Sequence, residues 1–92
     1  MDTAQEIERV FGRVYAETMY ALERSRPGER VTIFLSAPLF SYSDIAHRRE
    51  ILYRVDPNSE LPSVKMFGCN VEVYADSKPS FYVTTAMKYE FN

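Results

Sequence analysis

The feature that most constrains the fold is one amphipathic helix at the start of the chain, followed only by shorter segments. Thr3 and Glu6 have the spacing of a capping box, in which each side chain satisfies an orphan amide at a helix start. Proline disfavours a helical residue before it and glycine readily supplies a turn, so Pro27 and Gly28 predict that the helix ends near Ser25. Between these signals, residues for a buried face recur at helical spacing: Ile7, Val10, Phe11, Val14, Thr18, Ala21 and Leu22.

A glycine lies in the middle of this predicted helix. Gly12 costs about 1 kcal/mol there relative to alanine. We interpret it as a point at which the helix approaches a sheet closely, a packing role that carries no function.

Alternation of apolar and polar residues predicts strands in the rest of the chain. The alternating segments lie near residues 31–36, 50–55, 64–75 and 81–91. After the first strand, Ser41 and Asp44 have capping spacing, so a short helical segment is predicted to start at Tyr42. The residues 56–59 and 76–80 have turn chemistry and are expected to form hairpin loops. A change of inward parity near Gly68 predicts a bulge or break.

These elements predict an α+β two-layer sandwich. One long N-terminal helix is expected to pack on an antiparallel sheet of about four strands, in a single domain that spans residues 1–92. Because only one long helix is available to cover the sheet, its far face is expected to stay open.

Composition limits the setting in which the protein acts. Hydrophobic residues make up 46% of the chain and charged residues 26%, which is typical of a globular protein. Cys69 is the only cysteine, so no intramolecular disulfide can form, and the start of the chain does not resemble a signal peptide. No apolar run approaches the roughly 20 residues that cross a bilayer. We expect a cytoplasmic protein with no membrane role.

No constellation of residues predicts catalysis, a metal site or a cofactor. His47 follows Ser43 and Asp44, but Asp44 is better explained as a capping residue, and no activated nucleophile is placed by the sequence. Cys69 is interpreted as an inert thiol. The three glycines are scattered, so the chain has neither a phosphate loop nor a dinucleotide fingerprint. We therefore expect a protein that is not an enzyme and holds no metal or cofactor.

Aromatic residues indicate a binding surface instead, because tyrosine and arginine are enriched where interfaces derive their energy. If the alternating segments pair, their polar registers place rings and mixed charges on one sheet face. These residues are Phe34, Arg54, Glu72, Tyr74, Tyr82, Thr84, Lys88 and Glu90. Tyr20 and Tyr42 are further candidates for exposed rings.

The net charge is -2, but the middle of the chain is basic. Residues 24–54 carry six arginines against three acids: Arg24, Arg26, Arg30, Arg48, Arg49 and Arg54. The first three lie at the end of the long helix and in the turn after it, and the next two follow the short helical segment. If the two groups come together they form one basic edge, suited to bidentate contacts with phosphate or carboxylate groups.

In size and organisation the chain resembles the small phage-encoded inhibitors of host defence, such as anti-CRISPR proteins. The resemblance covers a compact domain of one helix on a sheet, with mixed charged and aromatic surfaces, and it transfers no functional residue. It implies a stoichiometric inhibitor, in the host cytoplasm, that occupies the nucleic-acid-binding surface of a larger protein or ribonucleoprotein complex. Acids would contact lysines of that complex, and arginines would contact RNA or DNA phosphates.

This non-enzymatic inhibitor is the leading hypothesis, and two other functions fit the same residues. A nucleic-acid-binding module would use the arginine edge and the aromatic sheet face, although the chain has no RNP-like motif. A homo-oligomeric accessory protein would pair through the edge formed by residues 81–91. The expected partner-binding residues are Tyr20, Phe34, Tyr74, Tyr82 and the six arginines of residues 24–54.

Overall fold

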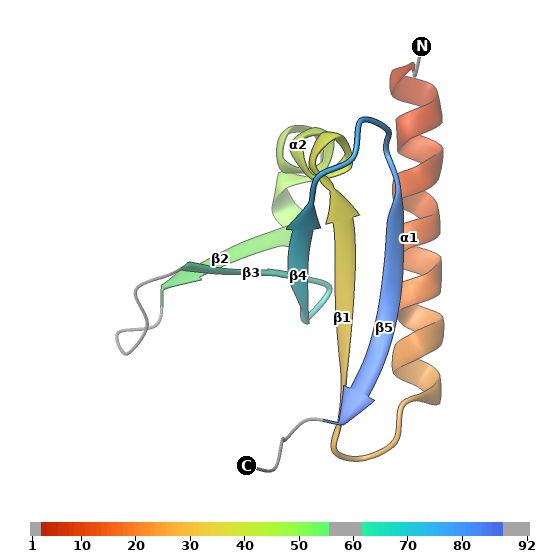
Figure 1. Cartoon of the computed structure of the whole chain (residues 1–92), viewed down its shortest axis with the longest axis vertical. Helices are drawn as coiled ribbons and strands as arrows, with labels where there is room; N and C mark the ends of the chain where they lie inside the picture. The colour runs from red at the N-terminus through yellow and green to blue at the C-terminus, as the bar shows by residue number, and fades with distance from the viewer. Residues whose placement is uncertain (1–2, 56–61, 88–92) are drawn as a thin grey trace.

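A computed structural model describes residues 3–55 and 62–87 of the chain. Its elements are α1 (Ala4–Arg24), β1 (Glu29–Ser36), α2 (Ala37–Ala46), the 3-10 turn η1 (Arg48–Glu50), β2 (Ile51–Val55), β3 (Pro62–Met66), β4 (Cys69–Tyr74) and β5 (Phe81–Met87). The strands form one sheet in the order β2-β3-β4-β1-β5, with α1 running along it (Figure 1). The predicted α+β class is confirmed. Neither helix in the described ranges has the length and apolar character needed to cross a membrane.

The long helix α1 begins and ends where the sequence predicts. The Thr3 hydroxyl accepts from the Glu6 amide at 3.2 Å, and the Glu6 carboxylate accepts from the Thr3 amide at 3.3 Å, so the capping box forms. The helix ends at Arg24, before the Pro-Gly turn. Its buried side chains are Phe11, Val14 and Thr18.

The surroundings of Gly12 contradict the interpretation that the helix approaches the sheet closely there. Gly12 is exposed, and a Cβ atom added there would meet nothing within 4 Å. The helix therefore does not approach the sheet closely at this position, and glycine brings only its entropic cost.

The core lies between α1 and one face of the sheet, with α2 closing the end. Ile33 and Leu35 of β1 are completely buried at its centre. The remaining core residues are Phe11, Val14, Val31, Leu39, Ile51, Met66, Cys69 and Val71. Val73 of β4 has the same parity as the buried Val71 but is 47% exposed.

The second helix is longer than predicted and starts earlier, at Ala37 rather than Tyr42. Pro38 lies in its first turn, where a proline is tolerated because the amide it lacks has no helical partner. Ser41 and Asp44 therefore lie inside the helix. The N-cap residue, Ser36, makes no side-chain cap bond. Its Oγ instead accepts from the Ser80 amide at 2.9 Å.

Within residues 3–55 and 62–87 the sheet has five strands where about four were predicted, and one of its pairings is parallel rather than antiparallel. β1 pairs parallel with β4 and antiparallel with β5. Residues 76–80 are therefore not a hairpin loop, because β1 lies between the two strands that they connect. The connection passes the end of β1 (Figure 1), where Ser36 donates its amide to the Ser80 carbonyl at 2.9 Å.

Of the predicted bulge or break at Gly68, the structure has a break: Gly68 lies in a tight turn between two strands. Phe67 and Gly68 have φ of 54° and 79°, and they connect the antiparallel strands β3 and β4. Two residues with positive φ suit a two-residue hairpin, because their twist matches that of the flanking strands. The Phe67 ring is held edge-on by Tyr15, with centroids 5.0 Å apart. The predicted loop 56–59 lies outside the described residues.

Replacing Gly12 by alanine should stabilise the protein, because the added methyl group meets no atom and the helix loses its entropic penalty. We expect the free energy of unfolding to rise by about 1 kcal/mol in urea denaturation. Gly68→Ala is the matched control and should destabilise, because its φ of 79° is costly for a residue with a Cβ. Equal effects of the two substitutions would contradict this account.

Candidate binding surface

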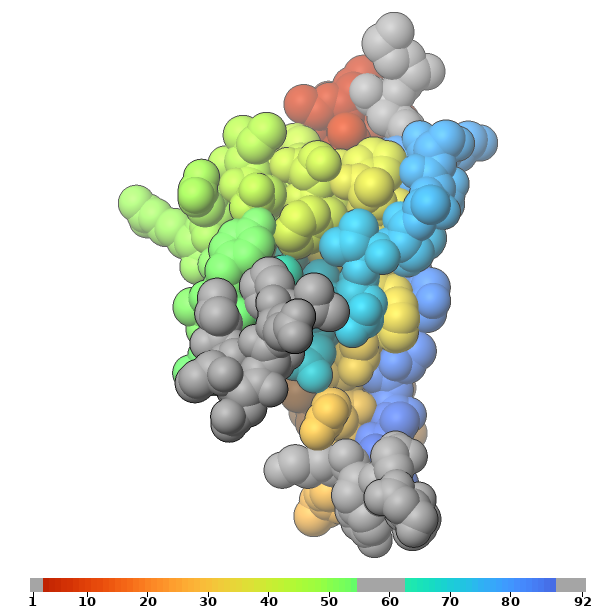
Figure 2. All heavy atoms as spheres, turned by 60° about the vertical axis from the view of Figure 1, so that its left-hand side comes forward, coloured from red at the N-terminus to blue at the C-terminus, as the bar shows by residue number. Residues whose placement is uncertain are grey.

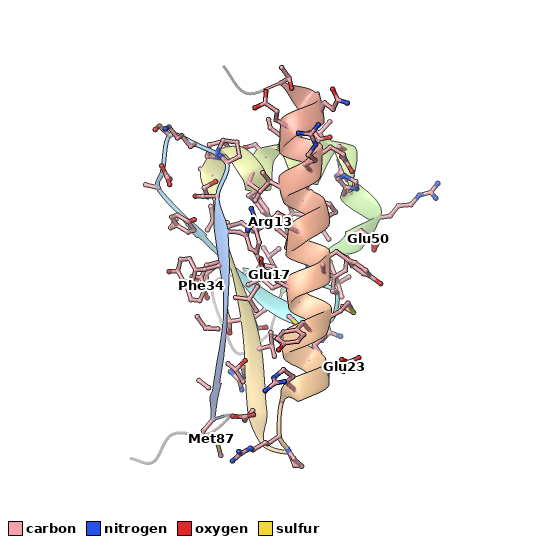
Figure 3. The ribbon with its side chains drawn as sticks, turned by 90° about the vertical axis from the view of Figure 1, so that its right-hand side faces the viewer. Arg13, Glu17, Glu23, Phe34, Glu50 and Met87 are labelled. Atoms are coloured by element: carbon pink, nitrogen blue, oxygen red, sulfur yellow. The ribbon has the colours of Figure 1, made fainter. Side chains whose placement is uncertain are left out.

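Both helices contribute to the core on one side of the sheet, and the other side is uncovered by them. Phe34 points away from α1 in Figure 3, and in Figure 2 the strands β4, β1 and β5 lie side by side at the surface, with α1 behind them. We call this side the open face. Residues paired across neighbouring strands share a face, so the open face holds Arg30, Thr32, Phe34, Asn70, Glu72, Tyr74, Tyr82, Thr84 and Ala86.

Three predicted rings meet on the open face, and we call them the aromatic cluster: Phe34, Tyr74 and Tyr82. The Phe34 and Tyr82 rings stack with centroids 4.5 Å apart and planes within 8°. Tyr74 lies 5.5 Å from Tyr82. Its hydroxyl is 2.7 Å from the Ser80 Oγ, so the ring is tied to the connection that crosses β1. Tyr82 remains 49% exposed, which leaves a fixed ring available to a partner.

The arrangement of the rings determines what they can bind. A platform for nucleobases presents ring faces to solvent, so that bases can stack on them. Here Phe34 and Tyr82 stack on each other, so one face of each ring is already covered. Glu72, register partner of Phe34, adds a negative charge that would repel phosphates. The cluster is better suited to an apolar patch on a protein, where rigid aromatic anchors contribute most of the binding energy.

A hollow of about 400 Å³ lies near the amino ends of β1 and β4, and we call it the basic notch. The pairing of β1 with β4 starts at Thr32, so no strand of the described residues lies beside residues 29–31 of β1 on that side. Arg30 and Lys65 bring two positive charges to the notch and Glu29 one negative charge. The sequence analysis did not select Lys65, because its place beside Arg30 depends on pairings between distant strands. The notch is lined by Leu22, Glu29, Arg30, Val31, Lys65, Gly68, Cys69 and Asn70.

The predicted basic edge does not form. Arg48 and Arg49 follow His47, whose Nε2 lies 2.7 Å from Glu8 near the start of α1. Arg24 is sixteen residues beyond Glu8, or about 24 Å along the helix at 1.5 Å per residue. In Figure 3 the labelled Glu50, at the end of η1, lies well above Glu23. The two arginine groups are therefore separate.

The remaining predicted residues that the structure describes lie at two separate places. Arg24 stacks over Tyr20, with its Cζ 5.3 Å from the ring centroid, and both line a hollow of about 380 Å³ with Arg26. The Arg26 amide donates to Glu29 at 2.6 Å. Arg54 falls in the open-face register, but on the β2–β3 hairpin, which projects away from the other strands (Figure 1). Lys88 and Glu90 lie outside the described residues.

A polar group of three side chains, Glu8, Tyr42 and His47, joins α1 to α2, and no sequence pattern predicted it. The Glu8 carboxylate accepts from the Tyr42 hydroxyl at 2.5 Å and lies 2.7 Å from His47 Nε2. The His47 ring stacks on Phe11 with centroids 3.8 Å apart. These hydrogen bonds, with Tyr42 the larger cause, lower the pKa of Glu8, and the bond to Glu8 raises the pKa of Tyr42.

The residues once considered for catalysis have separate roles. Ser43 is buried and donates to the Leu39 carbonyl at 2.8 Å, and Asp44 accepts from the Tyr53 hydroxyl at 2.8 Å. Neither contacts His47 through its side chain in the described part of the chain. Burial raises the pKa of the Cys69 thiol, which is opposite to what a nucleophile needs. Within residues 3–55 and 62–87, no three histidine, cysteine, aspartate or glutamate residues group as metal ligands.

Comparison with protein-family models, with curated proteins and with solved structures found no match to this chain. Functional roles are therefore argued from the geometry of its own surfaces.

Glu8→Gln tests the polar group between the helices. Because the folded pKa of Glu8 is lowered, its carboxylate contributes stability above the unfolded pKa, near 4.5, and this is lost as pH falls through the folded value. Glu8 is half exposed, so we expect a loss of about 0.5 kcal/mol at pH 6. The difference from the wild type should vanish toward pH 3 in denaturation series. Glu23→Gln removes a carboxylate from the same helix at its far end, away from Tyr42 and His47, and should change the free energy of unfolding at pH 6 by less than Glu8→Gln does.

Proposed function

We propose that this protein is a non-enzymatic binding protein that inhibits a larger protein or ribonucleoprotein complex. It would dock through its open face and occupy the nucleic-acid-binding surface of that complex. The observation that supports docking is the aromatic cluster, in which Phe34, Tyr74 and Tyr82 form a fixed, half-exposed patch. The inhibitory part of the proposal rests on the resemblance in size and organisation to small phage-encoded inhibitors.

Preorganisation is the physical reason for placing the anchor here. An interface loses free energy when it must order flexible side chains on binding. Tyr82 already stacks on Phe34, and the Tyr74 hydroxyl is already held by Ser80, so little ordering remains. Tyr20 is more exposed, at 60%, but lies on α1, away from this cluster. The open face is therefore the stronger candidate surface.

Charges around the aromatic cluster suggest how the partner is oriented. Arg30 lies on the same face and Lys65 shares its notch, while Glu72 lies beside Phe34 by register. A mixed rim of this kind suits a protein surface that carries both signs of charge. It also allows the cations to reach nucleic-acid phosphates already bound within a ribonucleoprotein complex.

Tyr82→Ala tests whether the aromatic cluster is the anchor. The tagged protein is used to capture partners from a bacterial lysate, with and without nuclease, and the captured proteins are identified by mass spectrometry. We expect the wild type to retain a defined complex after nuclease treatment. Tyr82→Ala should reduce affinity for that complex at least about tenfold, the effect of losing a central aromatic anchor.

Tyr20→Ala is the matched control, since it removes an exposed tyrosine from the other layer. It should leave capture unchanged, and thermal melts should show both variants folded. Equal loss in the two variants would remove the open face as the docking surface. Inhibition is then measured separately, by adding the purified protein to the captured complex and following its binding of nucleic acid.

Direct nucleic-acid binding is the second candidate, because Arg30, Arg54 and Lys65 fall in the open-face register. Three phosphate contacts to a single strand predict an affinity loss of about twentyfold for a fourfold rise in salt. Under the leading proposal, the free protein should not bind a labelled single-stranded RNA even at low salt. Binding with the steep salt dependence would put the second candidate first.

Charge reversal at Arg30 separates the open-face arginine from the distant ones. Arg30→Glu should weaken capture of the complex by about tenfold, because it removes a cation from the face that docks and adds an anion. Arg49→Glu makes the same change of charge on η1 and should change capture by less than about twofold. If Arg49→Glu has the larger effect, binding involves the η1 end of the molecule instead. Affinities are compared by titrating each variant against the purified complex.

A further inference from the structure

Among the residues that the structure describes, the strand β5 ends the sheet with no strand paired on its outer side. Its seven residues pair with β1 on the inner side, from Phe81 opposite Leu35 to Met87 opposite Glu29. No described strand lies beyond it. Figure 3 shows β5 nearly edge-on, beside α1 rather than beneath it. Every second amide and carbonyl of such an edge strand points outward and is available for pairing.

The sequence of this edge lacks the features that usually prevent association. Edge strands are commonly protected by a charged residue, a proline or a bulge. Residues 81–87 read Phe-Tyr-Val-Thr-Thr-Ala-Met, with no charge and no proline, and all seven are paired in an unbroken register. The opposite edge strand, β2, is shorter, at five residues, and carries the exposed Arg54. In the described part of the chain, the β5 edge is therefore the longer of the two and carries no charged residue of its own, while the Arg13 guanidinium of α1 lies 5.5 Å from the Phe81 ring centroid.

We propose that this edge binds a second copy of the chain, by antiparallel pairing of the two β5 strands about a two-fold axis at Thr84. A symmetric antiparallel pair places each residue opposite its mirror position, so Tyr82 faces Ala86, Val83 faces Thr85, and Phe81 faces Met87. None of these pairs brings like charges together, and a central threonine pair is favourable across strands. The axis stands perpendicular to the sheet, so both open faces lie on the same side.

Exposure of the strand supports this occupant. Met87 is 54% exposed and Tyr82 is 49% exposed, and pairing covers part of both. Phe81 and Val83 are only partly buried on the helix side, where they would meet Met87 and Thr85 of the second copy. A strand of seven residues can thus gain backbone hydrogen bonds and apolar contacts together. The result is one continuous sheet of ten strands.

Sedimentation of the purified protein tests the proposal with two matched variants. Thr84→Lys places two ammonium groups against each other at the axis, the means by which natural edges prevent pairing. Thr32→Lys adds the same charge on the neighbouring strand, at the register partner of Thr84 and on the same face. The wild type should shift toward dimer across roughly two decades of concentration. Thr84→Lys should raise the dissociation constant at least about tenfold, and Thr32→Lys by less than about threefold.

Amide hydrogen exchange of β5 is a second measurement. It uses only the wild type, so the proposal can still be tested if a variant fails to fold. Exchange of the outward-pointing amides of β5, every second one between Phe81 and Met87, should slow as concentration rises. A wild type that stays monomeric, or β5 exchange that is independent of concentration, overturns the proposal. So does equal loss of dimer in Thr84→Lys and Thr32→Lys, which would assign association to the open face. Protection of β5 only by a different protein would make it an edge for a partner's strand instead.

The self-association test needs no partner from the cell, so its outcome is separate from that of the proposed function. A monomer that captures its complex through Tyr82 would overturn only the dimer. A dimer that captures nothing would overturn only the docking proposal.

Discussion

The parallel pairing of β1 with β4 is the constraint on which the rest of the structure depends. It places β1 inside the sheet, where Ile33 and Leu35 become completely buried, and it leaves only the other side of β1 for β5. The connection from β4 must then cross the end of β1, where Ser36 and Ser80 exchange hydrogen bonds. Tyr74 on β4 and Tyr82 on β5 lie on either side of β1, and their ring centroids come within 5.5 Å only because of this strand order.

Local signals in the sequence predicted the local structure well. The predictions that were wrong concern contacts between residues that lie far apart in the sequence. The capping box at Thr3 needs only four residues, so its prediction held. Pro38 was ambiguous, because a proline both ends a strand and suits the first turn of a helix, and the helix that starts there was placed five residues late. Parallel pairing has no local signature, because the sequence of a single strand does not specify which other strand it pairs with. Turn chemistry at residues 76–80 therefore suggested a hairpin that the sheet order excludes.

The same contrast between local signals and long-range pairing applies to the residues of the candidate surface. Alternation was enough to place Phe34, Tyr74 and Tyr82 on one face, because parity follows directly from the period of a strand. Arginines are long and exposed, and their grouping depends on where whole elements lie, so the expected edge separated into distant groups. Lys65 and Glu8 could not have been selected from the sequence: each acquires its role from residues far along the chain.

One-sided coverage by the helices links the two surfaces proposed here. With α1 and α2 both used on the core side, the open face and the β5 edge meet along a single strand, whose Tyr82 belongs to the aromatic cluster. Pairing of two copies about Thr84 would put the two Tyr82 residues four positions apart along adjacent antiparallel strands, or about 14 Å. Both aromatic clusters would then face the same direction on one rigid sheet, and a partner with a repeated surface would meet two anchors at once. Linked anchors of this kind increase avidity without any new contact. The neutral edge thus has a physical use in binding, which a charged residue at Thr84 would remove while leaving each separate cluster intact.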